Sequence, residues 1–265
     1  MEVHLQQINF SYGGKQVIKN CSFSLAPGEL TVITGPNGSG KSTLVHLMGG
    51  LFTPDSGSVS LDGRDISTFD HLERACHVGV LMQEKMPALD FTVRERVMMG
   101  RFASLPRISA PREEECRRTN DVLELTQMSS FAETPCNQLS GGEYQKVLIG
   151  SLLIRRTPVM LLDEPTSALD PAGALGIMEL LRQRKQESAI AVVTHDLALA
   201  VSFADKLLLI NNGEVFASGT PEEVLTVENI ASVYGCESEI LNSSRGVIPV
   251  FGGKLPDIDR RQKGL

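Results

Sequence analysis

The stretch Gly35–Ser42 constrains the fold more than any other, because it matches the phosphate-binding loop pattern Gly-x4-Gly-Lys-Ser. An apolar run at residues 30–33 precedes it and indicates a buried strand, and residues 44–48 indicate the start of a helix. Glycines let the backbone bend until its N–H groups surround a phosphate, and the dipole of the following helix favours negative charge there. We therefore expect a strand, a phosphate-binding loop and a helix in this order.

Two side chains of this loop bring specific chemistry to a triphosphate. Lys41 supplies a positive charge at the β- and γ-phosphates, and the hydroxyl of Ser42 is a hard oxygen ligand suited to Mg²⁺. The loop residues that we expect to hold the phosphates are Gly35, Pro36, Asn37, Gly38, Ser39, Gly40, Lys41, Ser42 and Thr43.

Composition argues against several classes of function. The net charge is −7 and the pI about 5.3, so we do not expect a nucleic-acid binder that works by neutralising phosphates. The five cysteines are scattered and show no C-x-x-C spacing, which argues against a disulfide framework or a zinc site. No apolar run approaches the roughly 20 residues that span a bilayer. Any membrane work is therefore expected of a partner.

The strand and helix patterns predict an α/β fold with a mostly parallel core sheet. Residues 2–12 alternate apolar and polar side chains, as in an edge strand, and we expect an N-terminal antiparallel β-subdomain from them and the short strands nearby. Residues 91–99 and 111–125 indicate helices, which would form a helical subdomain inserted over about residues 84–157. Asn212-Gly213 predicts a β-hairpin.

The run Val159–Leu162 is a continuous apolar strand that ends in two acids, Asp163 and Glu164. In a phosphate-loop protein an acid at this strand end holds Mg²⁺, directly or through water, and we assign Asp163 to this role. Glu164 follows where the strand ends, so it can turn toward the γ-phosphate and polarise the attacking water as a general base. Two unpaired acids here would be costly to bury without a cation nearby.

Four further positions admit two interpretations from the residues alone. Tyr12 ends an alternating strand and is either an aromatic ring packed on the sheet or a ring stacked on a base. Gln83 and His195 each follow a buried strand, where polar residues often face the ligand crevice, although such residues are more often solvated or structural. Ser140 with Glu143 matches a capping box, which indicates either a well-capped helix or an anion site.

Taken in order, the motifs resemble those of the ATP-binding subunits of ABC transporters, over about residues 2–235. They stand here as Tyr12, the phosphate loop Gly35–Thr43 (Walker A), Gln83, Leu139-Ser-Gly-Gly-Glu143, Val159–Glu164 (Walker B), Ser167–Asp170 and His195. The resemblance implies that Tyr12 stacks on the base of ATP and that Ser140, Gly141 and Gly142 contact phosphate. It also implies the catalytic residues Lys41, Gln83, Glu164 and His195, and the Mg²⁺ ligands Ser42, Gln83 and Asp163.

The same resemblance implies how the protein assembles. Two copies would form a head-to-tail homodimer, with ATP between the phosphate loop of one chain and Ser140–Gly142 of the other. The helical lobe would contact integral-membrane permease subunits at the cytoplasmic face of the cell membrane. An extracytoplasmic substrate-binding protein would complete the system. We expect residues 1–238 to form the ATPase domain and residues 239–265 a short C-terminal extension.

Two segments narrow the choice of branch. Residues 91–101 and 219–226 are similar to those of importers of iron–siderophores, haem and cobalamin, and the ATPases of zinc and manganese importers are the alternative. A non-transport ABC ATPase is less expected, because the segment between Gln83 and Leu139 is too short for coiled-coil arms and holds no zinc pattern.

Many family members have Gln-Arg-Gln-Arg where this chain has residues 143–146, Glu-Tyr-Gln-Lys. The Ser-Gly-Gly core before them is intact.

Overall fold

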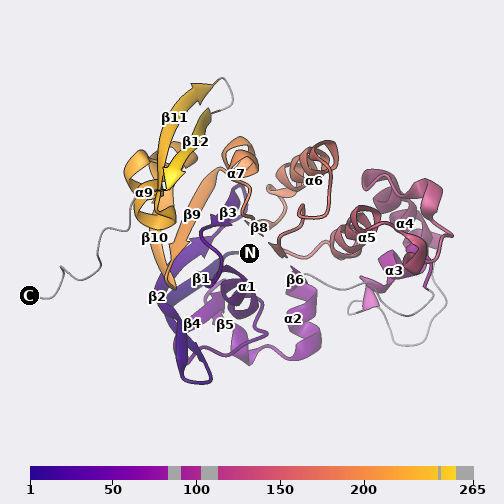
Figure 1. Ribbon diagram of the computed structural model, residues 1–265. Helices are drawn as coiled ribbons and strands as arrows, with labels where there is room; N and C mark the ends of the chain where they lie inside the picture. Colours follow the sequence, from indigo (N-terminus) through magenta and orange to yellow (C-terminus); the bar gives the residue numbers. More distant parts are fainter. Residues whose placement is uncertain (83–90, 103–112, 244–245, 255–265) are drawn as a thin grey trace, which may run out of the picture.

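The computed structural model of the protein describes residues 1–82, 91–102, 113–243 and 246–254 (Figure 1). The strands are β1 Val3–Tyr12, β2 Lys15–Leu25, β3 Leu30–Thr34, β4 Ser56–Leu61, β5 Arg64–Asp65, β6 Val78–Leu81, β7 Val159–Asp163, β8 Ala189–Val193, β9 Lys206–Asn211, β10 Glu214–Gly219, β11 Cys236–Ser243 and β12 Gly246–Lys254. The α-helices are α1 Lys41–Met48, α2 His71–His77, α3 Val93–Met99, α4 Glu113–Leu125, α5 Gly141–Leu153, α6 Pro171–Arg184, α7 Leu197–Phe203, α8 Pro221–Val224 and α9 Val227–Tyr234.

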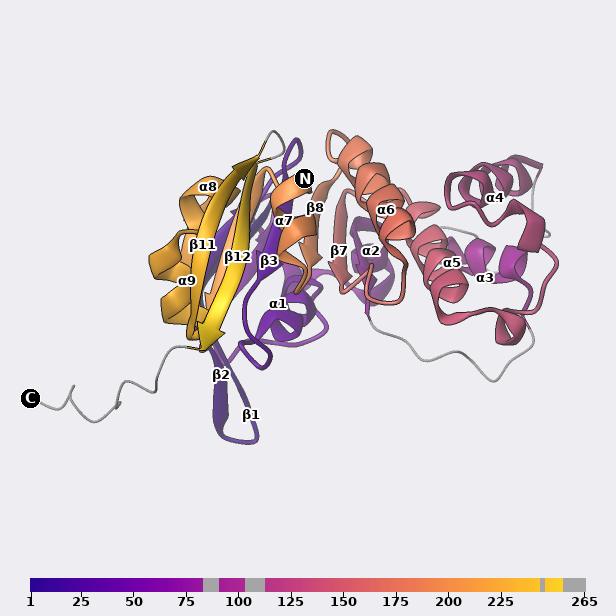
Figure 2. The same ribbon diagram turned by 45° about the horizontal axis from the view of Figure 1, so that its top comes forward.

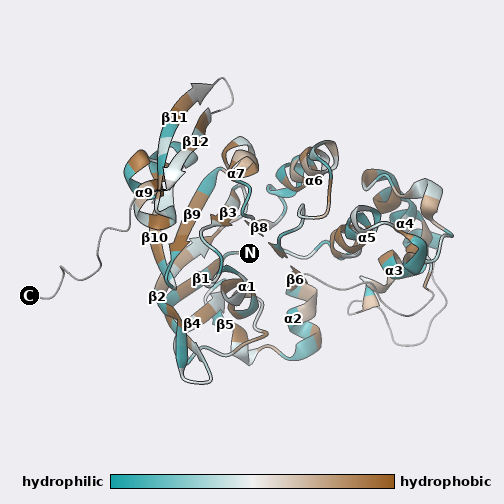
Figure 3. Cartoon of the chain, in the orientation of Figure 1, coloured by the Kyte–Doolittle hydropathy of each residue, from teal (hydrophilic) through white to brown (hydrophobic). Residues whose placement is uncertain are grey.

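The central sheet has the strand order β10-β9-β3-β8-β7-β6 and is parallel except for β10, which confirms the expected parallel core. Every residue of β3 and β8 is buried, because helices or the second sheet cover both faces. Figure 3 shows the hydrophobic colour along β9. The carboxyl ends of these parallel strands meet at one edge, and this edge carries the candidate site.

The N-terminal sheet is antiparallel, as expected, but β1 is not an edge strand. The order β2-β1-β4-β5 places β1 between two partners, with Val3 opposite Leu25 on one side and Leu61 on the other. The expectation of an edge strand was wrong because alternation reports only that one face of a strand is buried. It carries no information on how many neighbours bind the backbone.

The helical lobe is built from α3, α4 and α5, and α3 contacts both of the others. Figures 1 and 2 place this lobe at the opposite end of the molecule from β11 and β12. Helix α2 was not expected. It ends at His77, and Asp70 caps its first turn. None of the helices described here is long and apolar enough to cross a bilayer.

The C-terminal part of the described chain forms an antiparallel hairpin, β11 and β12, which packs on α7, α8 and α9. Strand β11 begins at Cys236, so it runs across the boundary that we place between residues 238 and 239.

Candidate functional site

The phosphate loop connects β3 to α1 through backbone conformations that favour glycine. Gly35 has φ 144°, and a Cβ atom there would lie 2.0 Å from the carbonyl oxygen of Ile210. Gly40 has φ 105° and is the N-cap of α1, and no side chain caps this end of the helix. The first N–H groups of α1 are therefore available to an anion, which they and the helix dipole favour.

The Lys41 side chain lies folded over the loop. Its Nζ donates hydrogen bonds to the carbonyl oxygens of Gly35, at 2.8 Å, and Pro36, at 2.9 Å. Burial lowers the pKa of the Lys41 ammonium, and the nearby carboxylates of Glu164 and Asp163 oppose this shift. The loop thus holds a positive charge in place next to two acids.

A cavity of about 300 Å³ brings the predicted loop and the predicted acids together. Its lining comes from the loop, the start of α1, the end of β7, and β2 and β8. The lining residues are Val17, Asn37, Gly38, Gly40, Lys41, Ser42, Thr43, Asp163, Glu164 and Val193. A triphosphate would meet backbone N–H groups, one cation, a hydroxyl and two carboxylates in this one space.

The two adjacent acids line the same cavity because the chain turns sharply between them. Asp163 ends β7, whereas Glu164 has φ 52°, in the left-handed region that residues other than glycine rarely adopt. The Glu164 N–H donates to the carbonyl oxygen of Val193, at 3.0 Å, which holds this conformation. Strained backbone of this kind concentrates at functional sites.

The Asp163 carboxylate fits a cation. Its Oδ1 atom is buried and has no hydrogen-bond partner within the described chain. The Ser42 hydroxyl lines the same cavity and adds a second hard oxygen. No group of three or more His, Cys, Asp or Glu side chains in the described parts could hold a metal alone. Two protein oxygens beside a phosphate site suit Mg²⁺, which usually completes its shell with phosphates and water.

His195 lies beside the second acid. It follows the carboxyl end of β8, and its Nδ1 is 2.9 Å from the Glu164 Oε2. The imidazole is largely exposed, at 67%, whereas the Glu164 side chain is 22% exposed. The structure therefore brings three predicted residues, Asp163, Glu164 and His195, to the edge of the phosphate loop.

Other predicted residues lie elsewhere in the chain. Ser140 caps α5 in a capping box: its N–H donates to the Glu143 Oε2 at 2.8 Å, and its Oγ accepts from the Glu143 N–H at 3.3 Å. The Ser140 hydroxyl also donates to the Glu143 Oε2, at 2.7 Å, and this bond and then the bond from the Ser140 N–H lower the pKa of the Glu143 carboxyl. Gly142 approaches the loop before α6, since a Cβ there would lie 2.9 Å from the carbonyl oxygen of Ala168.

Neither Tyr12 nor Ser140, Gly141 and Gly142 belongs to the lining of the phosphate-loop cavity. Tyr12 is 45% exposed at the end of β1. Gln83 lies outside the described residues.

Gly213 supports the phosphate loop, and the sequence analysis did not predict this role. The Gly213 N–H donates to the carbonyl oxygen of Ser39, at 3.1 Å. The Gly213 carbonyl accepts from the Lys19 N–H at 2.8 Å and from the Cys21 thiol at 3.1 Å. The Asn-Gly pattern correctly predicted a hairpin turn, but nothing in it indicated contact with the phosphate loop.

We compared the sequence and the structure with those of known proteins. The family model described as ABC transporter matches residues 18–167. The hemin import ATP-binding protein HmuV of Rhodococcus jostii is 37% identical over 254 residues, which cover 94% of this chain and 84% of that protein. The ferric enterobactin transport ATP-binding protein FepC of Escherichia coli is 35% identical over 252 residues, covering 94% and 91%.

A solved structure agrees with this grouping. The dimeric, post-hydrolysis ATP-binding cassette MJ0796 bound to ADP and Pi superposes with a TM-score of 0.74 at 30% identity. The match covers 83% of this chain and 98% of that one.

Proposed function

The chain belongs to the ABC transporter family as the ATPase subunit of an importer, and from this premise we propose that the cargo is an iron chelate, either a siderophore complex or haem, or else cobalamin. The similarity to hemin and ferric enterobactin ATP-binding proteins supports an iron chelate. An ATPase subunit of a zinc or manganese importer is the alternative.

The observation that carries the chemistry is that Asp163 and Glu164 share the cavity of the phosphate loop. ATP would lie with its phosphates on the N–H groups at the start of α1. Lys41 would exchange its two carbonyl partners for the β- and γ-phosphates. Ser42, Asp163 and Gln83 would hold Mg²⁺, which when bound neutralises charge on the phosphate oxygens.

Hydrolysis then follows from the position of Glu164. Its carboxylate would accept a proton from the attacking water as the water oxygen bonds to the γ-phosphorus. The bond from the γ-phosphorus to the β–γ bridging oxygen breaks, and the products are ADP and phosphate. His195 would hold the Glu164 carboxylate toward the water through its 2.9 Å contact.

ABC cassettes act as dimers, and we propose a head-to-tail homodimer for this chain. Ser140, Gly141 and Gly142 do not line the phosphate-loop cavity of their own chain. They would instead contact the phosphates bound by the second copy. The Tyr12 ring, exposed at the end of β1, would stack on the adenine.

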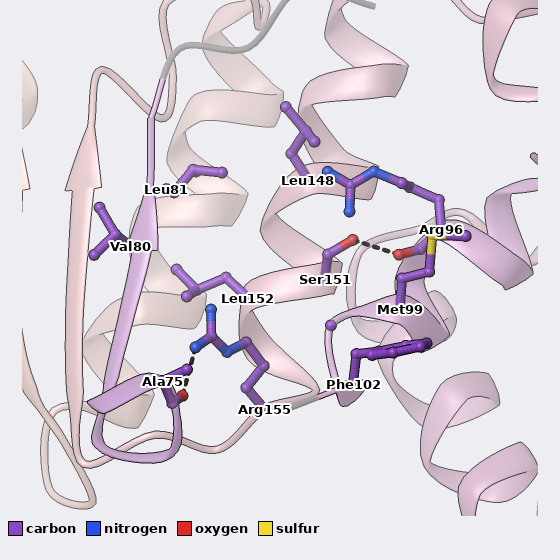
Figure 4. A pocket seen from close by; sticks show the side chains of 11 residues that line it. Ala75, Val80, Leu81, Arg96, Met99, Phe102, Leu148, Ser151, Leu152 and Arg155 are labelled. Atoms are coloured by element: carbon purple, nitrogen blue, oxygen red, sulfur yellow. Dashed lines mark hydrogen bonds between the residues drawn. The ribbon is translucent and has the colours of Figure 1, made fainter. Parts of the chain in front are cut away.

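A groove of about 290 Å³ between the helical lobe and the central sheet suits the permease (Figure 4). Leu148 and Leu152 of α5, Val80 of β6 and the 75% exposed ring of Phe102 contribute apolar side chains, although the exposed lining as a whole is more polar than apolar. Arg155 also lines the groove, and its guanidinium donates to the carbonyl oxygens of Ala75 and Val78. The permease would hold the protein at the cytoplasmic face of the membrane, and a substrate-binding protein would deliver cargo from the other side.

A substitution of Phe102 tests whether the permease binds at this groove. Phe102→Ser should reduce the amount of the chain that co-purifies with its permease, because an exposed aromatic anchor is lost. Leu241→Ser is the matched control, since Leu241 is 51% exposed on the remote β11. Equal recovery of both variants would place the permease contact elsewhere.

Uptake by cells that lack this chain tests the cargo. We would supply labelled ferric siderophores, haem and cobalamin, and separately zinc and manganese. Selective loss of one chelate would identify it as the cargo. Loss of free metal-ion uptake alone would establish the alternative importer class.

A further inference from the structure

A chain of ring side chains connects the end of β1 with α1, the helix that follows the phosphate loop. The Tyr12 ring stands edge-on to two other rings, at 4.9 Å from Phe10 and 5.6 Å from Phe52, between ring centroids. Phe10 and Phe52 are stacked, with centroids 5.4 Å apart and planes 5° apart. Perpendicular and stacked ring pairs at these distances are favourable. The stacked rings of Phe10 and Phe52 therefore orient the ring of Tyr12.

His46 extends this chain to a second strand end. Its ring centroid lies 4.7 Å from that of Phe52, and its Nε2 lies 2.9 Å from the Met82 Sδ. Its Nδ1 is buried without a hydrogen-bond partner among the residues described. A thioether is a weak acceptor, and an unpaired buried nitrogen costs stability. An apolar residue at this position of α1 would avoid that cost. The presence of the His46 imidazole therefore suggests that the side chain has a function.

We propose that Phe52 and His46 are positioning residues that connect the base-stacking ring of Tyr12 to Met82, directly after β6. The inference rests on the proposed function, in which Tyr12 stacks on adenine. A bound base fixes the Tyr12 ring, Phe52 follows through its perpendicular contact, and His46 passes the change to the Met82 sulfur. Met82 precedes Gln83 in the sequence.

The phosphates have a second, separate route to His46. The imidazole belongs to α1, whose first residue is Lys41, so a phosphate at the loop also acts on the backbone that carries it. Inorganic tripolyphosphate would use only this route, whereas ATP would use both. Comparing the two ligands therefore isolates the route through the rings.

The first measurement is affinity, from displacement of a fluorescent ATP analogue by ATP and by tripolyphosphate. Phe52→Leu should weaken ATP binding by about three- to tenfold, the range that one aromatic pair supports, and leave tripolyphosphate unchanged. Phe52→Tyr, which keeps the ring, should restore ATP binding. Phe216→Leu, at a ring 43% exposed on β10, is the matched control. Equal weakening of both ligands by Phe52→Leu would mean a merely structural role and overturn the proposal.

The second measurement follows Met82 itself. The protein would carry ¹³C-methyl methionine, and Met82→Leu would assign the Met82 signal. ATP should move this signal further than tripolyphosphate does, and the ATP-specific part should vanish in Phe52→Leu and in His46→Leu. If His46→Leu does not fold, His46→Gln, which lacks the ring, replaces it. Equal responses to the two ligands, or an ATP-specific response that survives both substitutions, would refute the connection.

Tyr12→Ala separates this inference from the function on which it rests. If Tyr12→Ala weakens ATP but not tripolyphosphate while Phe52→Leu changes neither, Tyr12 stacks on the base and only the connection fails. If Tyr12→Ala changes neither affinity, the base-stacking role and the inference both fail.

Discussion

At the scale of single residues, the site depends on conformation as much as on identity. Asp163 and Glu164 are neighbours in the sequence, and in a regular strand their side chains would point to opposite faces. The left-handed backbone of Glu164, with φ 52°, places both carboxylates in one cavity. In the function proposed here, the first acid holds the metal and the second acts as the general base.

Replacing Glu164 by Gln should leave ATP binding intact and slow hydrolysis by about a hundredfold or more, because an amide cannot accept the proton of the attacking water. The ATP-bound variant should also persist as a dimer in size-exclusion chromatography. Glu95→Gln, in the capping box of α3, is the control and should turn over normally. Wild-type turnover by Glu164→Gln would remove this residue as the base.

A second prediction concerns pH and Cys21. Burial raises the pKa of the Cys21 thiol to about 11 from its usual value of 9.0. The unfolded chain therefore releases this proton before the folded chain does. The resulting stabilisation is complete below pH 9 and is lost as the pH rises to about 11. Two pKa units correspond to about 2–3 kcal/mol.

Urea unfolding at several pH values checks this. The stability difference between the wild type and Cys21→Ala should shrink between about pH 9 and pH 11, because the variant lacks the thiol. A difference that stays constant over this interval would show that Cys21 does not titrate there.

At the scale of elements, the same capping box appears at three of the helices that the structure describes. Thr92 with Glu95 begins α3, Ser140 with Glu143 begins α5, and Thr220 with Glu223 begins α8. A capping box alone therefore does not identify a phosphate site. What distinguishes α5 is its position, since Gly142 meets the loop that leads to α6.

Matched substitutions at two of these boxes separate the roles. Ser140→Ala and Thr92→Ala should each lower the free energy of unfolding by about 1 kcal/mol, because each removes one cap. Only Ser140→Ala should also abolish ATP-driven dimerisation, measured by light scattering. If both variants dimerise alike, Ser140 is a cap and nothing more.

At the scale of the whole molecule, Ser140 does not line the cavity of the phosphate loop in its own chain, and the proposed dimer would supply it from the second copy. We expect Lys41→Ala and Ser140→Ala to be inactive alone but to recover activity when mixed. One of the two sites in a mixed head-to-tail dimer has an intact loop and an intact Ser140. With random pairing, up to about a quarter of wild-type ATPase activity should return. A mixture as inactive as its components would show that each chain uses its own Ser140.

The sequence by itself determined the features that depend only on residues adjacent in the chain. The phosphate loop, the apolar run before Asp163 and the capping box at Ser140 each need only a few neighbouring residues. They therefore predicted a parallel α/β fold and its ATPase family. The hairpin at Asn212-Gly213 followed for the same reason, since turns are local.

Only the tertiary structure decided which distant residues meet. The sequence could not show that β1 lies inside its sheet, that Gly213 supports the phosphate loop, or that His195 contacts Glu164. Nor could it connect Tyr12 to Met82 through Phe52 and His46. Each of these contacts joins residues from separate elements, and the hydrophobic pattern fixes only the buried face of an element. Its neighbours are selected by the packing of the whole chain.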